Sequence, residues 1–248
     1  MKNMKIKSEK MRLEIGGISD RGKVRENNED SIWYAYDNAE VLCIVADGMG
    51  GYQKGELSSK AAVDAAERFW KKKQASSNLK QIFHEAHEEI RKKSEAENIK
   101  TGTTVSVISF SNYKYLIAHA GDTRIYRLSR GVFSKLTLLT KDDTVVAEEL
   151  RKGILSKKEA ENHPRKHVIT NCIGASRNFS VFEAEGSFAS KDVFLLCSDG
   201  LYGKIRDAEL VSILKKCVNS QKTADELLEL AMRRGGEDNI SAIVVKFS

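Results

Sequence analysis

The sequence predicts an α+β fold in which mainly antiparallel sheets form a sandwich covered by helices. Short runs rich in β-branched residues end abruptly, as strands do, and apolar residues at helical spacing lie between them. Three of the strand-like runs fall within residues 103–128 and are separated by only a few turn residues. Connections this short favour antiparallel hairpins and leave no room for a helical crossover.

The elements follow one another in a clear order. The strand-like runs are 40–47, 103–110, 113–122, 124–128, 192–199 and 240–247. The patterns with apolar residues on one helical face are 61–69, 78–94 and 224–232. Thr223 is the expected N-cap of the last helix, with Glu226 three residues on. Helices after the first run and before the last predict layers of helix over sheet.

Length and composition favour one domain over residues 1–248. The 248 residues are 41% hydrophobic, with a mean hydropathy of -0.42, which is enough material for a sizeable core. The chain has one proline, Pro164, and no low-complexity tract that would read as a linker.

The same features favour a cytoplasmic protein that does not enter a membrane. No run approaches the roughly 18 apolar residues of a membrane span, and the charged first residues lack the apolar stretch of a secretory signal. The four cysteines are scattered and fit neither a zinc site nor a disulfide framework.

The chain carries a net charge of +6, which is compatible with nucleic-acid binding. Its Lys and Arg residues are mixed with Glu, however, and form no basic stripe with interleaved aromatic residues. We therefore expect a solvated basic surface and no nucleic-acid partner.

Acidic residues cluster where the apolar runs end or begin. The segments are Asn28-Glu29-Asp30, Ala46-Asp47-Gly48, Gly121-Asp122, Ser198-Asp199-Gly200 and Glu237-Asp238-Asn239. Each alone is more typical of a turn. Neighbouring strand ends meet at one rim, however, and converging carboxylates repel one another unless a cation neutralises them. Oxygen ligands without His or Cys favour Mg²⁺ or Mn²⁺, and Gly48 allows its carbonyl to approach such an ion.

A two-metal site of this kind can lower the pKa of a bridging water and orient it for attack on phosphorus. Arg25, just before the first acidic segment, could hold phosphate oxygens in a bidentate manner. The alternative for Arg25, taken alone, is a surface salt bridge.

Seven motifs in order resemble the protein phosphatase 2C-like family of metal-dependent Ser/Thr phosphatases, in particular its compact bacterial members. They are SDRGKVRENNEDS, VADGMGG, TGTTV, HAGDTR, NHPRKHVITNCIG, LLCSDGLY and EDNISAIVV. The resemblance covers nearly the whole chain. It implies a four-layer sandwich, with two antiparallel sheets flanked by helices and metals bound at one end.

The resemblance also implies roles for individual residues. Asp47 would bridge two Mn²⁺ or Mg²⁺ ions, the Gly48 carbonyl would bind one, and Asp199 and Asp238 would complete the other. Asp122 would bind a third metal together with Asp199. Acidic positions of the family that act through metal-bound water are matched by Glu29 and Asp30. Arg25 would bind phosphate, and Asn239 would support Asp238.

Two places depart from the family pattern. Met49 stands where animal members carry a histidine that protonates the leaving group, so we expect a water molecule to act as the acid. The segment Thr101-Gly102-Thr103-Thr104 replaces Met-Gly-Thr-Thr, a change expected to affect packing only. Residues 142–166 correspond to a flap beside the site and are expected to help select substrates.

The sequence therefore predicts a monomeric phosphatase of a bacterial cytoplasm that acts on proteins phosphorylated on Ser or Thr, including a cognate Ser/Thr kinase. Two alternatives remain. A metal-dependent nuclease or phosphodiesterase would also use clustered aspartates, and a pseudophosphatase could bind phosphoproteins without hydrolysing them.

Overall fold

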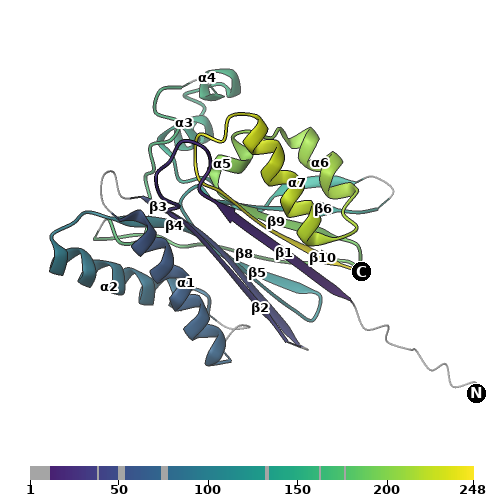
Figure 1. Cartoon of the computed structure of the whole chain (residues 1–248), viewed down its shortest axis with the longest axis horizontal. Helices are drawn as coiled ribbons and strands as arrows, with labels where there is room; N and C mark the ends of the chain where they lie inside the picture. Colours follow the sequence, from purple (N-terminus) through teal and green to yellow (C-terminus); the bar gives the residue numbers. More distant parts are fainter. Residues whose placement is uncertain are drawn as a thin grey trace, which may run out of the picture.

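Two five-stranded sheets pack face to face in the computed structural model (Figure 1). The structure describes residues 12–37, 39–49, 54–73, 78–131, 134–161, 163–175 and 177–248. The first sheet has the order β1 (Leu13–Asp20), β10 (Ile240–Phe247), β9 (Val193–Cys197), β6 (Arg124–Ser129) and β7 (Lys135–Leu138). The second has the order β2 (Asp30–Tyr36), β3 (Glu40–Met49), β4 (Gly102–Ser111), β5 (Lys114–Ala120) and β8 (Phe182–Ser187). All neighbouring strands are antiparallel.

Helices cover the outer faces of both sheets and confirm the predicted four-layer sandwich. The second sheet is covered by α1 (Gly55–Lys71) and α2 (Lys80–Glu97). The first is covered by α5 (Asp199–Tyr202), α6 (Asp207–Lys215) and α7 (Ser220–Arg233). Two short helices of the flap, α3 (Val145–Arg151) and α4 (Lys157–Glu161), lie at the end of the sandwich where the β1–β2 loop also lies (Figure 1).

Strand β3 shows why its sequence is an unbroken apolar run. Val41, Cys43 and Val45 face the other sheet, whereas Leu42 and Ile44 face α1 and α2. Side chains of a strand point to alternate faces, so a strand covered on both sides must be apolar at every position. The middle layers of the sandwich thus hold β3 rigidly up to its polar end.

The predicted hairpin between 113–122 and 124–128 is wrong. β5 belongs to the second sheet and β6 to the first, so the chain crosses between sheets at residues 121–123. Gly121 has φ +112°, a backbone conformation that side chains of other residues rarely adopt. This crossing places Asp122 between the two sheets.

The predicted N-cap of the last helix is also wrong. α7 begins at Ser220, and the Asn219 side chain accepts a hydrogen bond from the Lys222 N–H (2.9 Å). Thr223 lies inside the helix, where its hydroxyl donates to the Asn219 carbonyl (2.9 Å).

Within the described ranges, we find no helix of the length and apolar character that a membrane crossing requires. The charged segment before residue 12 lies outside the described residues.

Candidate active site

A pocket of about 400 Å³ collects most of the residues that the sequence singled out. It is lined by Arg25, Glu29, Asp47, Gly48, Met49, Thr104, Asp122, His167, Ile169, Asp199, Asp238 and Asn239. These residues come from strand ends of both sheets, from the β1–β2 loop and from the segment that follows the flap. Asp30 is buried beside the pocket, opposite Asp47 in the β2–β3 pair.

Asp47 and Gly48 lie near the polar end of β3, where the backbone is held from two sides. The Asp47 carbonyl accepts a hydrogen bond from the Thr103 hydroxyl (2.9 Å), and the Gly48 N–H donates to the Glu29 carbonyl (3.1 Å). A Cβ at position 48 would lie 2.2 Å from the Gly55 carbonyl oxygen. Glycine is therefore required there by the close approach of α1.

The other sheet supplies Asp199 and Asp238. Asp199 follows β9 and opens α5, and Asp238 shortly precedes β10, the antiparallel neighbour of β9. Asp122 lies just before β6, which pairs with β9 on its other side. Antiparallel pairing thus gathers these three carboxylates at one end of the sheet, as predicted.

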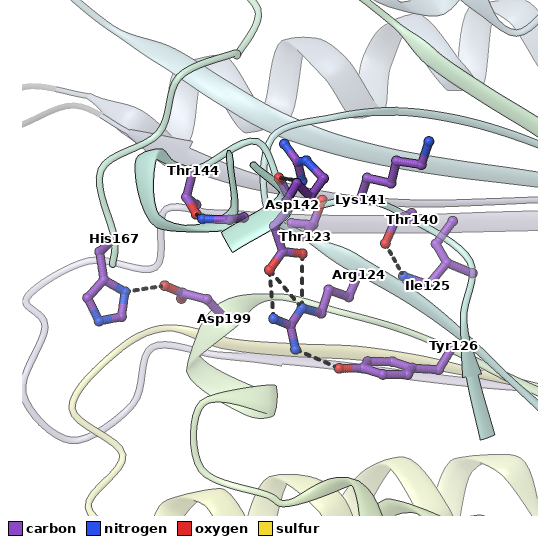
Figure 2. A network of polar contacts seen from close by, with 12 residues as sticks. Thr123, Arg124, Ile125, Tyr126, Thr140, Lys141, Asp142, Thr144, His167 and Asp199 are labelled. Carbon is purple, nitrogen blue, oxygen red and sulfur yellow. Dashed lines mark hydrogen bonds and ion pairs between the residues drawn. The ribbon is translucent and has the colours of Figure 1, made fainter. Parts of the chain in front are cut away.

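Two of the carboxylates pair with cationic or polar side chains. Arg25 binds Asp238 through Nη2–Oδ2 and Nε–Oδ1 contacts of 2.9 Å each. His167 Nδ1 lies 3.4 Å from Asp199 Oδ2 (Figure 2), and the hydrogen bond to Asp199 raises the pKa of His167. Both partners lie at the solvent side of the pocket, where they are more exposed than the carboxylates they meet.

The remaining carboxylates are held in an unfavourable environment. Burial, followed by repulsion from neighbouring carboxylates, raises the pKa of Asp47 and of Asp122 well above the usual range. Burial raises the pKa of Asp30 to about 7, against the effect of a hydrogen bond of 2.6 Å from the Ser198 hydroxyl. Asp30 Oδ1 is buried without a hydrogen-bond partner.

Glu29 and Asn239 connect the loops around the pocket. Glu29 Oε1 accepts from the Gly55 N–H (2.9 Å), and the Glu29 N–H donates to Asn239 Oδ1 (2.8 Å). The Asn239 amide also donates to the Arg21 and Asn27 carbonyls (2.9 Å each). With all these bonds made, the Asn239 side chain is engaged in holding the β1–β2 loop beside Asp238.

The donor set fits hard divalent cations. It consists of carboxylates and backbone carbonyls, and the repulsion within it together with the unpartnered Asp30 oxygen favours a positive charge in their midst. Over the described part of the chain, no three His, Cys, Asp or Glu side chains already surround one metal position, so cation binding would require these side chains to rearrange. A cation would compete with Arg25 for Asp238 and with His167 for Asp199.

Sequence reasoning gave no site role to four residues of this region. Thr104, His167 and Ile169 line the pocket, and Ser198 binds Asp30. His167 and Ile169 belong to the motif NHPRKHVITNCIG, for which the sequence predicts no role beyond residue 166. Their place follows from the return of the flap to the sandwich, a contact distant in sequence.

Comparison with known proteins gives a consistent picture. A model of the protein phosphatase 2C family matches residues 21–238. The serine/threonine phosphatase stp of Listeria monocytogenes is 35% identical over 239 residues, which cover 92% of this chain and 93% of that protein.

Solved structures are similar over the same length. The serine/threonine phosphatase PstP/Ppp of Mycobacterium tuberculosis aligns with a TM-score of 0.84 and 31% identity, covering 94% of this chain and 98% of that one. The catalytic domain of PstP in complex with two manganese ions aligns with a TM-score of 0.81 and 30% identity, covering 96% and 99%.

Proposed function

The chain belongs to the protein phosphatase 2C family, and from this premise we propose how its pocket works as the active site of a protein serine/threonine phosphatase. The enzyme hydrolyses phosphate esters of serine and threonine side chains and depends on Mn²⁺ or Mg²⁺. The observation that carries the proposal is the meeting of Arg25 with the carboxylates of both sheets in one pocket.

Asp47, Asp199, Asp238 and the Gly48 carbonyl would hold two cations in this pocket, and Asp122 with Asp199 would hold a third. When bound, the cations lower the pKa of a water molecule and orient it for in-line attack on phosphorus. The rigid end of β3 fixes Asp47 and Gly48, while Glu29, Asp30 and Asn239 position the loops and carboxylates around them.

Arg25 would bind the phosphate of the substrate. Its guanidinium already makes two parallel contacts to a carboxylate, and the same planar fork matches two phosphate oxygens. A cation on Asp238 would take the carboxylate that Arg25 now contacts and leave the guanidinium to face the substrate. Met49 lines the pocket without a titratable group, which is consistent with a water molecule as the acid.

We further propose that the chain forms a single catalytic domain and acts as a monomer in a bacterial cytoplasm, where it opposes a Ser/Thr kinase. The bacterial origin of the relatives supports this setting, and the four cysteines are free thiols, as is usual in a reducing compartment. The flap, residues 142–166, would contact the protein part of the substrate. No observation favours the nuclease or the pseudophosphatase.

The test is the hydrolysis of p-nitrophenyl phosphate and of phosphoserine and phosphothreonine peptides. Activity should require Mn²⁺ or Mg²⁺, should be lost in EDTA, and should fall by orders of magnitude in Asp47→Asn and Asp199→Asn. Asp207→Asn, which changes an exposed carboxylate on α6, is the matched control. Undiminished turnover after metal removal would disprove the mechanism, and cleavage of DNA or RNA without phosphopeptide hydrolysis would favour the nuclease.

A further inference from the structure

The crossing that carries Asp122 lies against the first residues of the flap. Figure 2 shows Arg124 reaching Asp142 and the Ile125 N–H reaching the Thr140 hydroxyl. The Arg124–Asp142 contacts include a bond of 2.6 Å, and the Arg124 guanidinium lies 3.7 Å above the Tyr202 ring. Residues 140–142, which lead into the flap, are therefore fixed to the start of β6 by side chains other than Asp143.

Asp143 bonds to the crossing on one side. Its Oδ2 accepts a hydrogen bond from the Gly121 N–H (3.0 Å), and its own N–H donates to the Gly121 carbonyl (2.7 Å). Both polar backbone groups of Gly121 are thus occupied by one residue, directly before Asp122. Gly121 has a positive φ of +112°. Its two hydrogen bonds to Asp143 hold the backbone in this conformation.

Asp143 also bonds to the segment that follows the flap, residues 168–171, which we call the returning segment. The same Oδ2 accepts from Asn171 Nδ2 (2.6 Å), and the Asp143 carbonyl accepts from the Thr170 N–H (2.8 Å). One carboxylate oxygen therefore joins the crossing to the returning segment. Ile169 of that segment, and His167 just before it, line the pocket.

We infer that Asp143 is a positioning residue that couples the position of the flap to the position of Asp122. A shift of the returning segment changes the bond from Asn171, and through the shared oxygen it changes the hold on Gly121. The inference rests on the proposed function in one respect, the assignment of Asp122 to a third cation.

Three variants separate this coupling from general stability. Asp143→Ala removes the shared acceptor. Asp143→Asn keeps an amide oxygen that can accept both N–H groups, and it should restore wild-type behaviour in large part. Glu148→Ala is the matched control, because Glu148 accepts from the Thr170 hydroxyl (2.6 Å) of the returning segment, whereas the bonds to Gly121 come from Asp143.

The first two readouts do not depend on activity. Trypsin should cut Asp143→Ala within residues 151–166, which are rich in Lys and Arg, about tenfold faster than the wild type, since a hydrogen bond to a charged group typically contributes this much. The affinity of the weakest Mn²⁺ site, measured by calorimetry, should fall by about tenfold as well. Glu148→Ala should change both the cleavage rate and Mn²⁺ binding much less than Asp143→Ala does, because Asp143 still joins the returning segment to Gly121.

The third readout is the split between kinetic constants. Asp143→Ala should raise KM for a phosphopeptide several-fold more than KM for p-nitrophenyl phosphate, which is too small to reach the flap. Asn171→Ala removes the side-chain donor of the returning segment to Asp143 Oδ2 and should show the same pattern. This variant replaces Asp143→Ala in the test if Asp143→Ala does not fold.

Two results would overturn the inference: faster cleavage of Asp143→Ala with unchanged Mn²⁺ binding, or an equal loss of Mn²⁺ affinity in Glu148→Ala. A wild-type protein without phosphopeptide hydrolysis would instead refute the proposed function, and the cleavage and Mn²⁺ measurements would still decide whether flap and crossing are coupled.

Discussion

Arg25 and Asp238 form a bidentate ion pair in the pocket, with two N–O contacts of 2.9 Å. They are far apart in the sequence and meet because β1 and β10 are antiparallel neighbours: Arg25 follows the end of β1, and Asp238 precedes the start of β10. A proposed phosphate-binding residue and a proposed metal ligand thus satisfy each other. Cation binding at Asp238 and phosphate binding at Arg25 are expected to reinforce each other.

Arg25→Ala is expected to weaken substrate binding more than turnover. The loss of two charge-assisted hydrogen bonds should raise KM for a phosphopeptide by roughly tenfold to a hundredfold, with kcat changed only a few-fold. Inhibition by inorganic phosphate should weaken in parallel, while Mn²⁺ affinity should not fall, because Asp238 loses a competitor. Lys23→Ala, which removes a positive charge from the same loop, is the control in steady-state kinetics. A loss confined to kcat would contradict a role in ground-state binding.

Asp30→Asn is expected to stabilise the protein in EDTA at pH 8. Burial raises the pKa of Asp30 to about 7, so the folded state binds the proton more tightly than the unfolded state, whose aspartate has a pKa near 3.9. Stability from this group is present below the unfolded pKa and is lost as the pH rises through the folded value. The amide removes that loss, so urea unfolding at pH 8 should require roughly 1–3 kcal/mol more.

The control for Asp30→Asn is the pH dependence of its gain in stability. The gain from Asp30→Asn should shrink toward pH 5, where the wild-type carboxyl is already protonated in the folded state. With Mn²⁺ present, the order should reverse, because the wild type would gain more from the cation. A gain of equal size at pH 5 and pH 8 would show that ionisation of Asp30 is not its cause.

The carboxylates of the site could be predicted from the sequence because each lies at or near the end of a strand with a strong apolar pattern. Strands β3 and β10 are apolar at nearly every position, which locates Asp47 and Asp238 without knowledge of the fold. The pairing of Arg25 with Asp238 and the position of His167 could not be predicted, because they depend on loop conformations and on contacts between distant segments. The edge strands β1, β2, β7 and β8 are absent from the predicted runs because their faces are only partly buried.

His119 should make the protein more sensitive to acid. It is fully buried between Ser106, whose hydroxyl lies 2.8 Å from Nδ1, and the Lys141 carbonyl, 3.0 Å from Nε2. Burial lowers the pKa of His119, although Asp142 and Asp143 act in the opposite sense. The folded state therefore binds the proton less tightly than the unfolded state, and stability is lost as the pH falls below about 6.5.

The check is the slope of stability with pH in wild type and His119→Asn. Because Asp30 acts in the opposite sense over part of the same range, the difference between the two slopes is the relevant quantity. Urea unfolding in EDTA between pH 5 and pH 7 should show that the free energy of unfolding of the variant falls less steeply with decreasing pH, whatever its overall loss of stability. Equal slopes in the wild type and the variant would mean that His119 is not the group that titrates.

The crossing between the sheets was missed because its turn looks like a hairpin connection in the sequence. A short Ala-Gly-Asp-Thr link between two strand-like runs fits either arrangement. Tertiary packing decides between them: Ile117 of β5 and Ile125 of β6 belong to the core between the two stacked sheets. Gly121 is the residue that makes this choice possible.

Gly121→Ala is therefore expected to be strongly destabilising. At φ +112°, a Cβ would lie 2.3 Å from Thr104 Cβ, a distance that forces β4 and the crossing apart. The strain should cost about 1–3 kcal/mol in the free energy of unfolding and should weaken Mn²⁺ binding, because Asp122 is the next residue. Gly131→Ala is the matched control, since a Cβ there would meet nothing within 4 Å. If urea unfolding showed both variants to be equally stable, the crossing would not depend on the backbone conformation of Gly121.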